Sequence, residues 1–234
     1  MENIISASDL SFGYDSKRKV LENINFQLKK GESVGLVGAN GVGKSTLLRI
    51  LVGLNTGFQG DVMVNNIPLE KKNLKTIRKN VGYVFQDADS QLFMSTVFDD
   101  VAFAPRNYGM SEAEVNEKTM EALKVVHIEQ LKDKQIYKLS GGEKKLASIA
   151  TILSTEPDVI LMDEPSVALD PKNILNQLNQ AKIIASHDLN MIMDTCERTI
   201  LLSDGKVIKD GNTKEILLDK ELMEESGLEL PLGY

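Results

Sequence analysis

The chain has 234 residues and a mass of 25.9 kDa, enough to bury a substantial core in one large domain or one domain with a smaller lobe. Hydrophobic residues make up 42% and charged residues 26%, which excludes a disordered chain, and no apolar run approaches the ~18 residues of a membrane span. The net charge of -7 argues against a protein that coats nucleic-acid phosphates, so no nucleic acid is expected as a partner.

The N-terminus and the cysteine content predict the compartment. Residues 1–5 carry no basic flank and no long apolar stretch, so they do not resemble a secretory signal. The single cysteine, Cys196, excludes an internal disulfide framework and a cysteine-rich zinc site, and it is expected to be a small apolar residue on a helix. We therefore expect a cytoplasmic protein that reaches any membrane through a partner.

The first third of the chain predicts strands followed by a loop and a helix. Short β-rich segments occupy residues 4–12 and 24–28, and an apolar run at 33–37, followed by glycines, is typical of a buried parallel strand. Residues 44–53 carry apolar side chains at the spacing of an amphipathic helix that ends at a glycine.

The remainder predicts further strands around a helical insertion. Strands are expected at residues 81–85, 159–162, 182–186, 199–203 and 206–209, the last two joined by the hairpin pair Asp204-Gly205. Between the first two lies a helix at 112–126, capped by Ser111 with Glu114 three residues later. The predicted fold is an α/β phosphate-loop core with a mainly parallel sheet, an antiparallel N-terminal β subdomain and an inserted helical subdomain.

A phosphate-binding loop follows the strand at residues 33–37. Residues 38–45 contain two glycines five positions apart, followed by Lys44 and Ser45. Glycines let the main chain curl so that its N–H groups, together with the start of the following helix, point at phosphate oxygens. Lys44 would lie against the β- and γ-phosphates, and Ser45 would ligate Mg²⁺. A simple glycine turn is the alternative. The predicted nucleotide-binding residues in this loop are Gly38, Asn40, Gly41, Gly43, Lys44, Ser45 and Thr46.

Two carboxylates end the apolar strand at residues 159–162. Asp163 would hold Mg²⁺ directly or through water, and Glu164 would act as the general base that polarises the attacking water. A solvated turn before Pro165 is the alternative, and the upstream phosphate loop weakens it.

The segment Leu139-Ser140-Gly141-Gly142-Glu143 opens a further helix and resembles the signature of the ABC ATPase family, a Leu-Ser-Gly-Gly-Gln/Glu loop placed before the Asp-Glu strand. The hydroxyl of Ser140 and the N–H groups at the helix start would form a second anion site. The resemblance implies that Ser140, Gly141 and Gly142 contact the γ-phosphate held by an opposite subunit. A plain helix cap at Ser140 is the alternative.

The resemblance extends to four single residues. Gln86 is similar to the glutamine that reaches Mg²⁺ and the attacking water, and His187 to the histidine that orients the catalytic glutamate. Tyr14 resembles the aromatic residue that stacks on adenine, and Asp170 lies in a loop similar to the one that crosses the dimer interface. The alternatives are polar strand ends for Gln86 and His187, a packing role for Tyr14 and a helix cap for Asp170.

Residues 86–93, which end in Gln91-Leu92-Phe93, resemble those of the energy-coupling-factor importers, whose ATPases drive uptake of vitamins or of cobalt and nickel ions. The resemblance covers nearly the whole chain and implies a single ATPase domain over 1–234, with a helical subdomain near 87–155 and a short tail near 212–234. It implies ATP and Mg²⁺ as cofactors, membrane-embedded transporter subunits and a second ABC ATPase subunit as partners, and a peripheral location on the cytoplasmic face of the cell membrane. The rival interpretation is a non-transport ABC ATPase that acts on ribosomes or DNA.

Two departures from the family pattern concern the subunit interface. Leu146 stands where the family usually has arginine, which removes a charge near the bound nucleotide, and residues 171–181 form a segment roughly two turns shorter at 3.6 residues per turn. Many members of the family carry an additional C-terminal region that helps two ATPases dimerise, whereas this chain ends soon after Pro231, so whether it pairs without nucleotide stays open.

Aromatic residues concentrate in one stretch of the sequence. Six of the chain's aromatic side chains lie between Tyr83 and Tyr108, and Phe93, Phe98 and Phe103 stand among acidic and polar residues. An apolar patch rimmed by acids suits a helix of a membrane subunit, so a docking surface is expected here. The core of the helical subdomain is the alternative.

Overall fold

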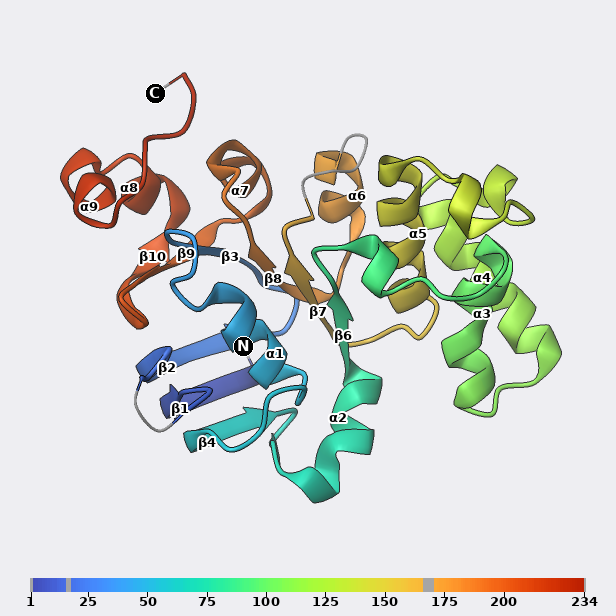
Figure 1. The fold of residues 1–234 in the computed structure, drawn as a ribbon, viewed down its shortest axis with the longest axis horizontal. Coiled ribbons are helices and arrows are strands. Elements are labelled where there is room, and N and C mark those ends of the chain that lie inside the picture. The colour runs from blue at the N-terminus through green and yellow to red at the C-terminus, as the bar shows by residue number, and fades with distance from the viewer. Residues whose placement is uncertain (1, 16–17, 166–170, 234) are drawn as a thin grey trace.

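The computed structural model describes residues 2–15, 18–165 and 171–233, and its strands form two sheets (Figure 1). The strands are β1 (Asn3–Phe12), β2 (Leu21–Lys29), β3 (Ser33–Val37), β4 (Gln59–Val64), β5 (Ile67–Pro68), β6 (Val81–Val84), β7 (Val159–Asp163), β8 (Ala181–Ala185), β9 (Arg198–Ser203) and β10 (Lys206–Asn212).

The smaller sheet is antiparallel and has the strand order β2-β1-β4-β5. Its central strand β1 pairs Ile5 with Leu28 on one side and with Val64 on the other. These three side chains are buried, so the register directs one apolar face of the sheet inward. The predicted antiparallel N-terminal subdomain is present.

The larger sheet has the order β10-β9-β3-β8-β7-β6, and every pair except β10 with β9 is parallel. Strands β7 and β8 are buried along their whole length, as expected for parallel strands covered on both faces. The hairpin between β9 and β10 turns at Asp204 and Gly205, which both have positive φ, at 47° and 72°. The carboxyl ends of the parallel strands carry the polar residues singled out above.

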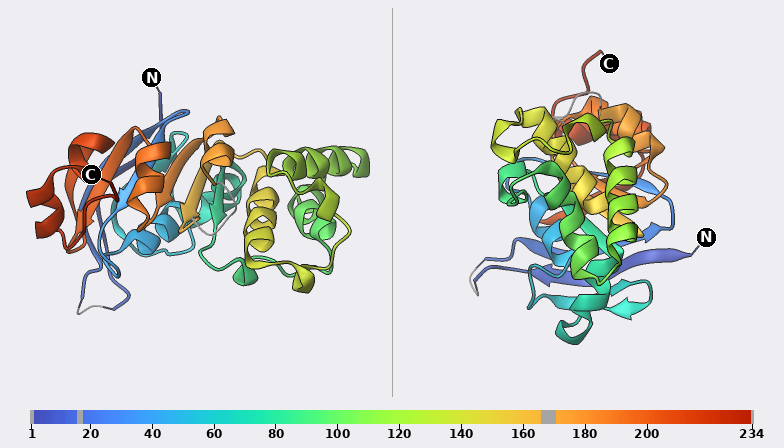
Figure 2. Two further views of the ribbon diagram at one scale, coloured as in Figure 1. Left: turned by 90° about the horizontal axis from the view of Figure 1, so that it is seen from above. Right: turned by 90° about the vertical axis from the view of Figure 1, so that its right-hand side faces the viewer.

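The helices cover the larger sheet and extend beyond it at one end (Figures 1 and 2). The helices are α1 (Lys44–Leu51), α2 (Leu74–Asn80), α3 (Val97–Asn107), α4 (Glu112–Val125), α5 (Gly141–Leu153), α6 (Pro171–Gln177), α7 (Leu189–Thr195), α8 (Thr213–Leu217) and α9 (Lys220–Glu225), with short 3-10 turns η1 (Lys71–Asn73), η2 (Ala88–Ser90), η3 (Glu129–Leu131) and η4 (Ile136–Lys138). In the described part of the chain, no helix has the length and apolar character needed to cross a membrane.

Two hydrophobic clusters form the core, one on each face of the larger sheet. Along β7, Ile160 and Met162 join the cluster under the helices, whereas Val159 and Leu161 join the cluster that contains α1 and the smaller sheet. Helix α1 therefore lies sandwiched between the two sheets (Figure 1). Helices α3, α4 and α5 pack on one another at the β6 end, while α8 and α9 lie at the opposite end (Figure 2).

Candidate active site

Glycines shape the loop between β3 and α1, which leads into the start of the helix. Gly43, the residue before the helix, has a φ of 112°, and a Cβ atom there would lie 2.7 Å from a Leu21 methyl carbon. At Gly38, with φ of 152°, a Cβ atom would lie 2.4 Å from the Leu202 carbonyl oxygen. Both positions therefore require glycine. The first main-chain N–H groups of α1 have no partner within the helix and can bind an anion.

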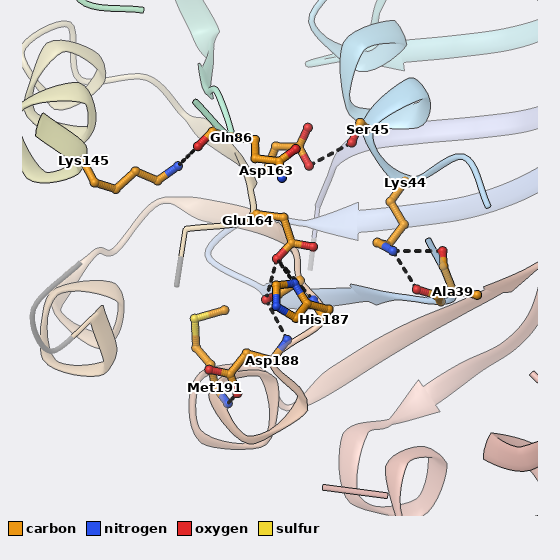
Figure 3. Close-up of polar contacts among 12 residues, drawn as sticks. Ala39, Lys44, Ser45, Gln86, Lys145, Asp163, Glu164, His187, Asp188 and Met191 are labelled. Carbon is orange, nitrogen blue, oxygen red and sulfur yellow. Dashed lines mark hydrogen bonds and ion pairs between the residues drawn. The ribbon is translucent and has the colours of Figure 1, made fainter. Parts of the chain in front are cut away.

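Lys44 closes this loop upon itself (Figure 3). Its Nζ donates to the carbonyl oxygens of Gly38 at 2.6 Å and Ala39 at 3.2 Å. Burial lowers the pKa of the Lys44 ammonium, and the carboxylates of Glu164 and Asp163 oppose that shift. The buried cation is therefore held over the loop by two main-chain carbonyl oxygens.

Each carboxylate oxygen of Asp163, at the end of β7, accepts from one hydroxyl group. Ser45 Oγ donates to Oδ1 at 3.0 Å, and Tyr83 on the neighbouring strand β6 donates to Oδ2 at 2.9 Å. Burial, followed by the charge of Asp163, raises the pKa of Tyr83, so its hydroxyl stays protonated and donates. Among the described residues, no three His, Cys, Asp or Glu side chains gather as a metal group. The oxygen donors of Ser45 and Asp163 nevertheless match the preference of Mg²⁺.

Glu164 directly follows β7 and contacts the end of β8 and the residues between β8 and α7 (Figure 3). Its main chain has a positive φ of 49°, and its N–H donates to the Ala185 carbonyl. Its Oε2 accepts from Ser186 Oγ at 3.2 Å and from the His187 main-chain N–H at 3.3 Å, and it lies 2.7 Å from His187 Nδ1. The carboxylate is largely buried, whereas the imidazole is 71% exposed, so the histidine ring can reach a ligand.

Gln86 lies two residues beyond the end of β6, which is one residue shorter than the predicted strand at 81–85, and it is on the Asp163 side of the site (Figure 3). The carbonyl oxygens of Phe85 and Gln86 accept hydrogen bonds from Lys145 Nζ at 2.7 and 3.1 Å. Burial lowers the pKa of the Lys145 ammonium, and the carboxylates of Asp163 and Glu164 oppose that shift. Residues 38–46, Gln86, Asp163, Glu164 and His187 thus form one site at the carboxyl edge of the larger sheet.

The segment at residues 140–142 belongs to a different part of the molecule. Ser140 caps α5: its Oγ accepts from the Glu143 N–H at 3.3 Å, and its own N–H donates to Glu143 Oε2 at 2.7 Å. Gly141 begins the helix, and a Cβ atom there would meet no atom within 4 Å. The capping alternative is therefore realised for the Ser140 side chain, while the start of the helix stays open to a ligand.

Tyr14 lies beside the phosphate loop. Its hydroxyl is 3.2 Å from Thr46 Oγ1 and accepts from Asn55 Nδ2 at 3.2 Å, and its ring packs edge-on against Phe12. The side chain remains 63% exposed, which leaves a ring face free for stacking. It lines a cleft together with residues 39–42 and Thr46. Asp170 lies outside the residues that the structure describes.

Two residues in this region are not indicated by sequence motifs. In the sequence, Tyr83 is one more apolar residue of a buried strand, and Lys145 is one more polar residue of a helix. Only the register between β6 and β7 brings the Tyr83 hydroxyl to Asp163, and only the packing of α5 buries Lys145. Leu146 lies in the core, 6% exposed, among the residues under the helices.

Comparison with known proteins gives concordant results. The family model described as ABC transporter matches residues 21–167. The energy-coupling factor transporter ATP-binding protein EcfA of Methanocaldococcus jannaschii is 40% identical over 239 residues, covering 97% of this chain and 86% of that protein.

Solved structures agree with the fold. The structure of cbiO1 from Clostridium perfringens, part of the ABC transporter complex cbiONQ, has a TM-score of 0.84 and 34% identity and covers 96% of this chain and 94% of its own. The dimeric cassette MJ0796 bound to ADP and Pi has a TM-score of 0.79 and 29% identity, covering 89% of this chain and 98% of its own. The predicted fold class is confirmed.

Proposed function

Because the chain belongs to the ABC transporter family and is an ATP-binding subunit whose ATP hydrolysis is coupled to transport, we propose that it drives an energy-coupling-factor importer. Its cargo would be a vitamin or a transition-metal ion, selected by a membrane-embedded partner. Two similar proteins support this class: the 40% identical EcfA is named for an energy-coupling factor transporter, and cbiO1 is part of an ABC transporter complex. The chain would lie on the cytoplasmic face of the membrane.

The observation that carries the catalytic assignment is the paired arrangement of Asp163 and Glu164. Asp163 points to Ser45, and Glu164 is held by the residues that follow β8. Mg²⁺, held by Ser45, Asp163 and Gln86, would neutralise charge on the β- and γ-phosphate oxygens. Lys44 would bind the same oxygens, and residues 38–46 would cradle them with main-chain N–H groups. Tyr14 would stack on the adenine ring.

Glu164 would take a proton from the attacking water, and His187 would hold its carboxylate in place. Oε2 already accepts from the Ser186 hydroxyl and the His187 main chain, which leaves Oε1 as the oxygen able to reach water. The exposed His187 ring would contact the γ-phosphate. These roles make Glu164 the proton acceptor and His187 its orienting partner.

We further propose that two subunits share each site. Ser140, Gly141 and Gly142 lie on the helical subdomain near residues 87–155 and would complete the site of a second ABC ATPase subunit, identical or paralogous. The dimeric form of the MJ0796 cassette supports this arrangement. Asp170, between β7 and α6, would cross the same interface.

The membrane partner would dock on the aromatic patch, defined as Phe93 and Phe103. Phe93 is 64% exposed and stacks edge-on against Phe103, which is 38% exposed, at a centroid distance of 4.8 Å. An exposed pair of rings in edge-to-face contact offers an apolar anchor for a partner helix. Phe98 is half-buried, so its ring is a weaker candidate than the sequence indicated.

Co-purification from membranes, followed by mass spectrometry of the partners, tests the proposal. We expect integral membrane proteins of an importer to be recovered, and ATP hydrolysis by that complex to require Glu164. Recovery of ribosomes or DNA in place of membrane proteins would instead support the non-transport alternative.

A further inference from the structure

The main chain that carries Gln86 is attached to helix α5 at several points. Gln91 accepts from the Phe85 N–H through Oε1 at 3.1 Å and donates through Nε2 to the Ser148 carbonyl at 2.7 Å. Lys144 forms an ion pair with Asp89. Residues 85–91, which follow the end of β6, are therefore attached to α5 by several side-chain contacts.

Lys145 makes the contact nearest to Gln86. Its side chain is 2% exposed, and its ammonium donates to the carbonyl oxygens of Phe85 and Gln86. Figure 3 shows the contact with Gln86. Burying a lysine ammonium costs solvation free energy that an apolar side chain in the same place would not cost. A buried lysine is therefore stable only where its hydrogen bonds offset that cost. The Gln86 side chain makes no hydrogen bond to another described residue, so its direction depends on its main chain.

Helix α5 begins at the segment proposed to serve the second subunit. Lys145 lies four residues after Gly141, on the first turns of the same helix. A displacement of residues 140–142 by a partner's nucleotide would therefore be transmitted along a rigid helix to the Lys145 ammonium. The attached carbonyl oxygens would then carry Gln86 with them.

From these contacts we propose that Lys145 is a positioning residue, which fixes the main chain of Gln86 to helix α5. Gln86 then enters the nucleotide site of its own chain only when residues 140–142, at the start of α5, contact the nucleotide of the second subunit. This role rests on the proposed function and deepens it, because it joins the two nucleotide sites of a dimer through one side chain. Lys145 acts through Gln86 and touches neither nucleotide.

The chain contains a matched control. Lys182 is also buried, 5% exposed, and its Nζ likewise donates to two carbonyl oxygens, those of Leu178 at 2.6 Å and Gln180 at 3.3 Å. Lys182→Met therefore removes the same chemistry from a place that no proposed role involves. Lys145→Met is compared with it, and Lys145→Arg, which retains the charge and the donors, is the rescue variant.

The first measurement is amide hydrogen exchange of the nucleotide-free protein. In Lys145→Met we expect exchange across residues 85–91 to rise by about tenfold, because the segment loses the side chain that holds the Phe85 and Gln86 carbonyl oxygens to α5. Lys182→Met should leave this segment unchanged. Unchanged exchange in Lys145→Met would overturn the proposal, and this result does not depend on ATP hydrolysis or on a membrane partner.

The second measurement is steady-state ATP hydrolysis. We expect Lys145→Met to lower kcat by about tenfold or more with KM within about twofold, and Lys145→Arg to restore most of kcat. Lys182→Met should keep kcat within about twofold. Equal losses in the two methionine variants would mean that Lys145 is only structural. If Lys145→Met does not fold, Lys145→Gln replaces it, with the same outcomes. Absence of ATPase activity in the unmodified protein would refute the proposed function and leave the exchange result standing.

Discussion

Oε2 of Glu164 lies 2.7 Å from Nδ1 of His187, and the same oxygen accepts the His187 main-chain N–H at 3.3 Å. One residue thus holds the carboxylate through both its ring and its backbone. A carboxylate held in this way has a fixed direction for its free oxygen, which is what a general base requires.

Replacing Glu164 with glutamine keeps the shape of the side chain and removes its ability to accept a proton. We expect Glu164→Gln to bind ATP normally and to lose turnover by about 10²-fold or more. Steady-state hydrolysis, together with binding of a fluorescent ATP analogue, measures both quantities. Unchanged hydrolysis would remove Glu164 from its assigned role.

ATP should promote dimers in the Glu164→Gln background, since hydrolysis no longer separates the subunits. Adding Ser140→Arg should abolish these dimers, because a bulky side chain would occupy the proposed γ-phosphate contact. Sedimentation with and without MgATP tests this expectation. A monomer at saturating MgATP contradicts the shared site, and a tight dimer without nucleotide would show that the chain pairs constitutively.

The Tyr83 hydroxyl holds one oxygen of Asp163, so its removal should affect metal binding more than nucleotide binding. In Tyr83→Phe we expect the Mg²⁺ concentration needed for half-maximal binding of a non-hydrolysable ATP analogue to rise by about tenfold. Affinity without Mg²⁺ should stay unchanged. Tyr108→Phe is the control, because its hydroxyl donates to the Arg78 carbonyl, away from Asp163. A normal Mg²⁺ requirement in Tyr83→Phe argues against this role.

Truncation of the aromatic patch should weaken docking without affecting the nucleotide site. Phe93→Ala is expected to bind ATP normally and to weaken co-purification with the membrane partner by an amount equivalent to roughly 2 kcal/mol. Ile208→Ala, which removes an exposed apolar side chain from β10, is the control. Full retention of the partner by Phe93→Ala would place the docking surface elsewhere on the chain.

Asp100 should make stability depend on pH. Burial raises the pKa of its carboxyl above the usual 3.8, although the N–H groups of Met94 and Phe93 bind Oδ2 at 2.8 and 3.0 Å. A raised folded-state pKa contributes stability that is fully present below the unfolded pKa and is lost as the pH rises through the folded pKa. Asp100→Asn keeps an oxygen for both N–H groups and removes the charge.

We therefore expect the free energy of unfolding of Asp100→Asn to fall less than that of the unmodified protein as the pH rises from about 4 to 7. Urea unfolding at several pH values measures this difference. Asp99→Asn, at a partly exposed neighbouring carboxylate, is the control. Parallel curves for Asp100→Asn and the unmodified protein would contradict the assignment.

Sequence patterns predicted the elements whose signals are local. The strand at residues 33–37 and the helix with the Ser111 cap formed as expected, because runs of apolar residues and capping side chains act within a few residues. Strand β4 and helices α2 and α3 were not predicted. Helix α3 contains Pro105, a residue that argues against a helix interior, and the first half of β4 is exposed, so it lacks the alternation of a half-buried strand.

The candidate site also contains residues that local motifs predict and residues that only the packing of the fold brings in. Lys44, Ser45 and Asp163 could be assigned from motifs because their chemistry depends on spacing along the chain. The contacts of Tyr83 and Lys145 depend on how strands and helices pack, which a linear pattern does not contain. The Phe98 ring shows the limit of such patterns: its acidic neighbours indicate a position at or near the surface, and the packing of the fold leaves the ring half-buried.

The hydrophobic cluster under the helices has a consequence for unfolding. It contains Val101 and Leu123 from the helical part together with Ile184 and Leu201 from the larger sheet, with no break between them. Helices α3 to α5 therefore have no separate core with which to survive alone. Heat or denaturant should melt them together with the sheet in one cooperative transition, so a calorimetric and a van't Hoff enthalpy should agree.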